Sequence, residues 1–366
     1  MSKETKQDDN NLTPRAPQNQ KNEEKTFANK EILPKMKKIE SEEPSHLQLN
    51  EKFLKRWSIE GLIGKGGYGE IYLAVDVVKG EEVAIKVEPK KRRGKLAKRM
   101  ILEQHVMFKM QGKPHVPLIF GSGYTEKINF IIMQILSINV GDIKKSNPNK
   151  RLSQCSVGRI IHQSITALRD LHETGYVHRD VKPANMCFGI YPSVHRMFSI
   201  PQSFQSRHIL ILLDFGLVRR YKLDSGEWRE PRVRAGFRGT TRYVSIRVHR
   251  RCEQSPYDDL VSVMYTSYEL LSGELPWKHL EKSEEVLQLK EIMTENGVNP
   301  ELFKGEKSVL MDFFKMVSET DPYKTPNYDQ LIECIKVLYS PKTLTDPYEW
   351  EENHKSTDEC SEENSK

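Results

Sequence analysis

Hydrophobic residues in the first third of the chain fall into short runs separated by polar and glycine-rich stretches, a pattern typical of β-strands. The runs 57–63, 71–75 and 82–87 are strand-like, and residues 129–136 form a more continuously apolar strand. Later in the chain, apolar residues recur at a spacing of three and four, as they do in helices. The sequence therefore predicts a β-sheet first and a mainly helical region after it.

Three helices stand out in this pattern. The first covers residues 100–107, between the third and fourth strands. The second covers 153–173 and is followed by Gly175, a residue that commonly ends helices. The third begins at Tyr257, is strongly apolar and ends near Gly273. Polar-faced helical segments follow it, so the second region is expected to be larger than the first.

A cluster of glycines separates the first two strands. It consists of Gly64, Gly66, Gly67 and Gly69. Glycine allows backbone amides to approach phosphate groups without a side chain in the way. Dinucleotide-binding folds have a similar glycine pattern, but a helix follows it there, whereas residues 71–75 are strand-like. We therefore expect a phosphate-binding hairpin.

One lysine lies inside the third strand. Lys86 is either a solvent-facing strand residue or a ligand of the α- and β-phosphates, and its position 17 residues after Gly69 favours the second interpretation. Such a lysine needs a carboxylate partner on the following helix. Glu103 is the expected partner, because it lies among apolar residues at helical spacing.

Two short motifs further along contain two acids, a lysine and an amide. Asp180 is placed to accept the proton of a substrate hydroxyl, and Lys182 would offset charge on a transferring phosphate. Asn185 and Asp214 have the oxygen ligands that Mg²⁺ prefers. Each motif alone is more often a surface cluster or a turn. A chance occurrence of all four motifs in this order along the chain is remote.

These motifs resemble the eukaryotic protein kinase family over about 280 residues, from Trp57 to Tyr339. Within that family, residues 111–116, 214–221 and 236–245 resemble the casein kinase 1 superfamily, especially its tau-tubulin kinase branch. The long connection between Asn185 and Asp214, Val261 and Arg247 depart from that branch. These departures concern the substrate and the closest subfamily rather than catalysis.

The resemblance implies an α+β fold with two lobes. A small lobe of antiparallel strands and one helix is expected over residues 57–135, and a larger, mainly helical lobe over 136–340. Residues 1–50 are polar and are expected to form a disordered tail. Residues 341–366 are expected to form an acidic tail, in which Tyr348 and Trp350 could dock on the body.

The resemblance also implies ATP and Mg²⁺ as cofactors and transfer of phosphate to Ser or Thr. Met133 is expected beside the adenine and Cys187 beneath it, where Cys187 can equally be a buried small hydrophobe. Thr240 is expected to hydrogen-bond around Asp180, and Asp259 to anchor the catalytic loop. The expected catalytic set is Lys86, Glu103, Asp180, Lys182, Asn185 and Asp214, with Asn185 and Asp214 as metal ligands. The expected nucleotide contacts are Ile63, Gly64, Lys65, Gly66, Gly67, Tyr68, Gly69, Glu70, Ile71, Ala84, Lys86, Met133, Leu136 and Cys187.

Charge is concentrated in the middle of the chain. The net charge is +6; the first 50 residues are balanced and the last 26 carry three basic and eight acidic side chains, so residues 51–340 hold +11. Residues 214–251 alone carry eleven basic side chains against four acids. Such a run is usually a solvated face, but its position favours recognition of acidic or phosphorylated protein substrates, which casein kinase 1 relatives prefer. Constitutive activity is also expected.

Two other function classes remain open. A pseudokinase scaffold would bind nucleotide without transferring phosphate. A nucleic-acid-binding protein would explain the basic charge, but the sequence has no zinc-ligand spacing, helix-turn-helix or aromatic platform for it. The basic run 90–95 is either a nuclear-import signal or a solvated loop.

Cysteines and hydropathy bear on the compartment. Five scattered cysteines indicate free thiols in a reducing compartment. No apolar run reaches the roughly 20 residues that cross a bilayer, and no signal peptide is apparent. We expect a cytoplasmic, or also nuclear, monomer.

Overall fold

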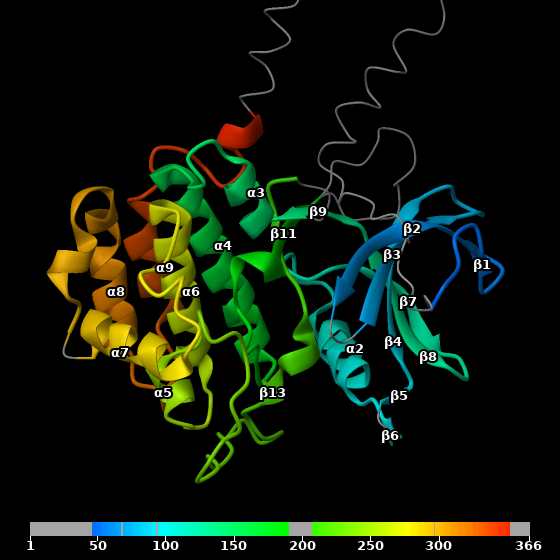
Figure 1. Ribbon diagram of the computed structural model, residues 1–366, viewed down its shortest axis with the longest axis horizontal. Helices are drawn as coiled ribbons and strands as arrows, with labels where there is room; N and C mark the ends of the chain where they lie inside the picture. The colour runs from blue at the N-terminus through cyan, green and yellow to red at the C-terminus, as the bar shows by residue number, and fades with distance from the viewer. Residues whose placement is uncertain (1–45, 67–68, 93, 190–206, 296, 352–366) are drawn as a thin grey trace, which may run out of the picture.

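A computed structural model describes residues 46–66, 69–92, 94–189, 207–295 and 297–351 (Figure 1). The tails predicted at the two ends, the loop between Asn185 and Asp214, and Gly67 and Tyr68 therefore lie partly or wholly outside the described residues. The remaining chain forms a β-rich lobe and a larger helical lobe, which lie side by side in Figure 1. This is the α+β, two-lobed fold that the motifs predicted.

The small lobe is built on one antiparallel sheet of six strands in the order β1-β2-β3-β4-β8-β7. The strands are β1 (Lys52–Phe53), β2 (Trp57–Gly66), β3 (Gly69–Asp76), β4 (Glu82–Pro89), β7 (Ile119–Tyr124) and β8 (Ile128–Gln134). All four predicted strands are present. Gly66 and Gly69 face each other across β2 and β3, so the glycine cluster lies at a hairpin, as expected.

Strand alternation gives this sheet two different faces. One face has its own core, which includes Ile59, Tyr72 and Ile85. The opposite face presents Ala84 and Met133, which belong to the core shared with the large lobe. The helix α2 (Arg99–Met110) packs against β8 and β7. A short hairpin of β5 (Lys91–Arg92) and β6 (Lys95–Leu96) leads into it.

The large lobe consists mostly of helices around the long helices α4 and α6. Its helices are α3 (Val140–Ser146), α4 (Gln154–Glu173), α5 (Ile246–His249), α6 (Pro256–Ser272), α7 (Ser283–Thr294), α8 (Met311–Ser318) and α9 (Tyr328–Lys336). Short 3-10 turns are η1 (Pro183–Asn185), η3 (Phe215–Leu217), η4 (Pro300–Phe303) and η5 (Gly305–Leu310). Among the residues that the structure describes, no helix is both long enough and apolar enough to cross a membrane.

Small sheets line the border with the β-rich lobe. Strands β9 (Leu136–Asn139), β11 (Met186–Gly189) and β12 (Leu210–Leu212) form one, in the order β12-β11-β9. Strands β10 (Tyr176–Val177) and β13 (Arg219–Arg220) pair as the other. The segments that carry Asp180, Lys182, Asn185 and Asp214 begin or end at these strands.

The boundaries of the two long helices follow from capping. Ser153 accepts a hydrogen bond from the Ser156 amide at the start of α4, and Gly175, with φ of +86°, follows its end. Ser255 and Asp258 form a capping box at the start of α6, and Gly273 ends it with φ of +90°. Both helices therefore lie where the sequence predicted them.

Buried residues lie outside the predicted domain limits at both ends of the described chain. Leu47, assigned to the polar tail, is only 2% exposed and belongs to the outer core of the sheet. Tyr348, beyond the predicted boundary at residue 340, is 1% exposed against α4. Single apolar anchors in polar surroundings give no periodic signal, so the hydrophobic pattern does not extend to them.

Candidate active site

The catalytic loop is held in place from the long helix α6. Asp259, the fourth residue of α6, accepts hydrogen bonds from the backbone amides of His178 (2.7 Å) and Arg179 (2.8 Å). His172 of α4 contacts the same carboxylate at 2.9 Å. Burial raises the pKa of Asp259, but the His172 contact, the nearby His178 and the amides outweigh it and lower the pKa. The predicted anchoring by Asp259 is confirmed.

Asp180 follows this anchored segment and is 7% exposed. Thr240 donates its hydroxyl to one carboxylate oxygen of Asp180 at 2.7 Å, and Lys182 donates to the other at 2.8 Å. Lys182 also contacts the Thr240 hydroxyl at 2.9 Å. The expected bonds between Thr240, Asp180 and Lys182 are thus present. They fix both oxygens of Asp180 while leaving each further acceptor capacity.

Asn185 and Asp214 are brought together by backbone pairing. The Leu213 amide donates to the Asn185 carbonyl at 2.8 Å, which places Asp214 next to Asn185. The Asn185 side-chain amide donates to the Asp180 carbonyl at 2.8 Å, so its orientation is fixed. Across the described part of the chain, no cluster of three or more His, Cys, Asp or Glu side chains could hold a metal alone. A carboxylate and an amide oxygen fit Mg²⁺, which binds through few protein ligands together with phosphates.

Lys86 joins the two lobes electrostatically. Its Nζ lies 2.6 Å from the Glu103 carboxylate on α2 and 3.3 Å from Asp214. Burial lowers the pKa of Lys86, but the carboxylates of Glu103 and Asp214 outweigh it and raise the pKa. The predicted pairing of Lys86 with Glu103 is confirmed.

Arg99 is a second cation at this point. Its Nη2 lies 2.9 Å and 3.0 Å from the two oxygens of Asp214. Burial raises the pKa of Asp214, and the positive charges of Lys86 and Arg99 more than reverse this, so the carboxylate is held ionised. The sequence did not point to Arg99, because no motif marks the first turn of this helix.

The predicted nucleotide contacts of the small lobe lie mostly on the face of the sheet that shares a core with the large lobe. Ile71 pairs with Lys86 across β3 and β4, and Ala84 pairs with Met133 across β4 and β8. Ile63 packs partly buried against the same core. On the large-lobe side, Leu136 and Cys187 form a small apolar cluster with Ile211. Burial raises the pKa of Cys187 to about 12, so this thiol stays neutral.

The side chain of Glu70 does not lie on the face of the sheet that carries Ile71 and Lys86. Strand alternation places its side chain on the opposite face of the sheet from Ile71. There the carboxylate accepts hydrogen bonds from the His46 amide (3.0 Å) and the Tyr72 hydroxyl, and Lys65 lies 3.5 Å away. Its assignment to nucleotide binding is therefore corrected: the Glu70 side chain holds residues 46–50 to the sheet.

Comparison with known proteins agrees with this geometry. The protein kinase domain model matches residues 57–335. The chain belongs to the protein kinase family. A Caenorhabditis elegans protein named "Putative casein kinase I C03C10.2" is 51% identical over 90% of this chain and 95% of its own length. The resemblance to casein kinase 1 is therefore confirmed at the level of a casein kinase 1-like serine/threonine kinase.

More distant relatives are also kinases. A Dictyostelium discoideum protein named "Probable serine/threonine-protein kinase DDB_G0292354" is 32% identical over 81% of this chain and 56% of its own length. The Caenorhabditis elegans serine/threonine-protein kinase spe-6 is 25% identical over 82% of this chain and 76% of its own length. The special likeness to the tau-tubulin branch stays a prediction.

Several basic side chains of residues 214–251 form salt bridges with carboxylates of this chain. Glu253 forms salt bridges with Arg219 at 2.7 Å and with Arg232 at 2.5 Å, and Arg250 forms one with Glu291 at 2.7 Å. Sequence analysis missed Glu253, because a single acid 34 residues from Arg219 forms no motif. The cations of the segment with no carboxylate partner among the described residues are Lys222, Arg229, Arg234, Arg238, Arg242 and Arg251. Counting basic residues therefore overstated the charge available to a partner.

Proposed function

We propose that this serine/threonine kinase transfers the γ-phosphate of Mg²⁺·ATP to hydroxyls in acidic or already phosphorylated protein segments. The observation that carries the chemistry is the arrangement around Asp180. Its carboxylate is buried, fixed by Thr240 and Lys182, and set beside Asn185. A positioned carboxylate of this kind can accept the proton of a hydroxyl group as the hydroxyl attacks phosphorus.

Lys182 supplies the second part of this chemistry. Its ammonium group, 2.8 Å from Asp180, would balance negative charge that develops on the transferring phosphoryl group. Because Lys182 also holds Thr240, the charge and the proton acceptor keep one relative position. Positioning and charge balance are what phosphoryl transfer requires from a protein.

The cofactor would be held by residues of both lobes. Asn185 and Asp214 would ligate Mg²⁺, which neutralises charge on the phosphates when bound. Lys86 would contact the α- and β-phosphates, and Glu103 at 2.6 Å keeps its ammonium group oriented. Met133, in the core shared by the lobes, and Cys187, in the cluster with Leu136, would contact the adenine from opposite lobes.

The substrate preference is proposed from two arginines. Arg238 and Arg242 flank Thr240, whose hydroxyl touches Asp180, so their side chains extend from the segment nearest the proton acceptor. Arg238 is exposed, and neither arginine has a carboxylate partner within the described residues. Guanidinium groups bind carboxylates and phosphates through paired hydrogen bonds. An acidic residue close to the target hydroxyl would meet these two groups first.

The test compares matched peptides that carry one Ser beside acidic, phosphorylated or neutral residues. Wild type is expected to have the highest kcat/KM for the acidic and phosphorylated peptides. The double variant Arg238→Gln/Arg242→Gln should lose about tenfold or more on those peptides, and little on the neutral one. Arg250→Gln, which removes a charge already paired with Glu291, is the control. Equal rates for all peptides with wild type would contradict the proposed preference.

A further inference from the structure

Arg99 is bound to the carboxylate that the proposed function assigns to the metal. Its Nη2 reaches both Asp214 oxygens, at 2.9 Å and 3.0 Å, whereas Lys86 approaches only one of them, at 3.3 Å. The side chains are 16% and 29% exposed, so solvent screens the pair only partly. This pair is the closest charge contact of Asp214 among the described residues.

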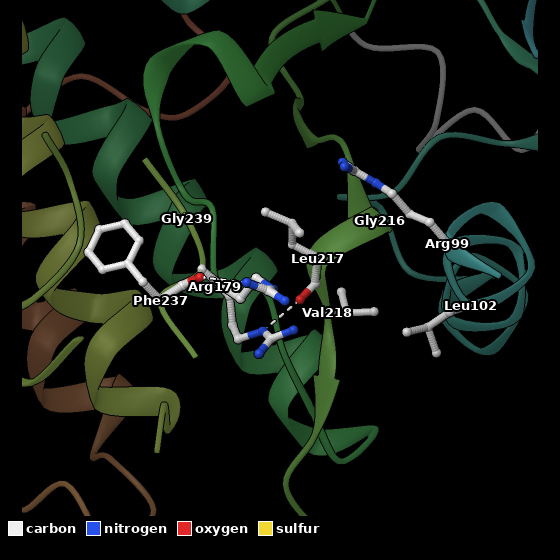
Figure 2. Close-up of a pocket in the computed structure, with 9 residues that line it drawn as sticks. Arg99, Leu102, Arg179, Gly216, Leu217, Val218, Phe237 and Gly239 are labelled. Carbon is white, nitrogen blue, oxygen red and sulfur yellow. Dashed lines mark hydrogen bonds between the residues drawn. The ribbon is translucent and has the colours of Figure 1, made fainter. Parts of the chain in front are cut away.

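The position of Arg99 is determined by its surroundings. Glu88 of β4 accepts the Met100 amide at 2.9 Å, which fixes the first turn of α2 to the sheet. On the other side, Arg99 lies directly on Gly216, where an added Cβ would come within 2.1 Å of the Arg99 Nε. Figure 2 shows Arg99 extending from the helix toward Gly216. Only glycine at position 216 leaves room for this contact.

Arg99 and a metal ion would act on the same carboxylate with the same sign of charge. Each Asp214 oxygen keeps acceptor capacity beside its bond from the guanidinium, but Mg²⁺ bound there would lie close to a second cation and be repelled by it. Arginine cannot relieve this repulsion by losing its proton, because its pKa is too high. The guanidinium at Asp214 therefore opposes binding of the metal.

A pocket of about 560 Å³ lies beside Arg99, whose side chain forms part of its wall (Figure 2). Apolar side chains such as Leu102 and Val218 line it, together with two further cations, Arg179 and Arg238. Rotation of Arg99 into this space would release Asp214 but would bring three guanidinium groups together, which repel one another. The pocket therefore favours the position of Arg99 on Asp214.

We propose that Arg99 competes with Mg²⁺ for Asp214 and thereby raises the metal concentration that the kinase needs to bind nucleotide. This inference rests on the proposed function, because it assumes that Asp214 is a metal ligand. The guanidinium neutralises Asp214 in this structure. Lys86 contacts Glu103 of its own lobe and Asp214 of the large lobe at the same time.

The test measures binding of ADP by calorimetry at a series of Mg²⁺ concentrations and constant ionic strength. Arg99→Gln removes the competing charge and is expected to lower the half-saturating Mg²⁺ concentration by about threefold to tenfold. Arg99→Met, which keeps the apolar stem, gives a second measure if the first variant folds poorly. Arg151→Gln, which removes an exposed charge paired with Glu306 away from the site, is the control and should match wild type.

The outcomes separate this inference from the proposed function. If wild type binds ADP with Mg²⁺ but the Arg99 variants need the same or more metal, competition is wrong and Arg99 instead positions Asp214. If wild type shows no Mg²⁺-dependent binding of ADP at all, the proposed metal site fails as well. A lower metal requirement in both Arg99 variants, absent in Arg151→Gln, supports competition.

Discussion

Asp259 illustrates the residue scale, because one buried carboxylate orients a loop to which it does not belong. It accepts hydrogen bonds from two consecutive backbone amides, those of His178 and Arg179, and contacts the imidazole of His172. Arg179 has a positive φ of 71°, a backbone conformation that needs such support. The position of Asp180 follows from these contacts, because Asp259 holds the two residues that precede it.

Two half-buried histidines, His162 and His249, make stability depend on pH. Burial lowers the pKa of His249, and that of His162, from 6.5 to about 4. Lys290, 3.2 Å from His249, adds to the effect there. The unfolded chain takes up these protons near pH 6.5 while the folded chain does not, so their contribution is complete above that pH and is lost as pH falls toward 4.

We therefore expect the free energy of unfolding to fall from pH 7 to pH 4, measured by urea denaturation at each pH. His249→Gln should flatten that slope relative to wild type. His279→Gln, at a side chain that is 79% exposed, should leave it unchanged. A slope in His249→Gln as steep as in wild type would show that this imidazole does not contribute.

At the scale of elements, one buried ion pair connects α3 with α6. Lys144 contacts Glu269 at 2.6 Å and the carbonyl of Gly273 at 2.7 Å, and the Tyr243 hydroxyl donates to the same glutamate. Both charged side chains are about one-tenth exposed. The link therefore ties α3 and α6 to the segment that follows Thr240.

Removing one member of this ion pair should destabilise the fold more than replacing both members by apolar residues. Lys144→Met leaves Glu269 buried without its cation, and we expect a loss of about 3 kcal/mol in the free energy of unfolding. The double variant Lys144→Met/Glu269→Leu removes both charges and should recover most of that loss. Chemical denaturation of the three proteins measures this. A double variant that is less stable than the single one would contradict the argument.

The elements that sequence analysis predicted share strong periodicity or a clear cap. The helix α4 combines an apolar stripe with Ser153 and Gly175 at its ends. The helix α5, by contrast, has one turn, Ile246–His249, which is too short for a periodic signal. Lys86 and Glu103 were predictable because each lies among apolar residues of a periodic element, and Lys86 stands at a recognisable spacing from the glycine cluster. Arg99 and Glu253 were not, since their roles depend on distant partners.

At the scale of the molecule, residues 341–351 attach the end of the chain to α4. The Arg159 guanidinium, 3.7 Å from the Tyr348 ring centre, donates to the carbonyls of Leu344, Asp346 and Pro347. Tyr348 stacks on Trp350 at 4.4 Å and contacts Phe188 of β11. The segment thus supports the strand that carries Cys187. Sequence analysis named Tyr348 and Trp350 as residues that could dock on the body, and they do. It did not indicate which elements they contact, because isolated aromatic residues point to no particular partner.

Truncation after residue 340 should destabilise the large lobe. It exposes the surface under Tyr348 and leaves the buried Arg159 without its carbonyl partners, so we expect a loss of about 3 kcal/mol or more. Truncation after residue 351 keeps all described contacts and is the control. Thermal unfolding of the two proteins compares them. Equal melting temperatures would show that the segment contributes nothing.

The most direct measurement of the central claim is transfer of labelled γ-phosphate from ATP to an acidic Ser peptide, with and without Mg²⁺. We predict Mg²⁺-dependent transfer by wild type and a loss of at least about a hundredfold in kcat for Asp180→Asn, which keeps the shape of the side chain. Binding of ADP should persist in the variant. Transfer that is equal in the two proteins, or absent in wild type despite nucleotide binding, would contradict the account.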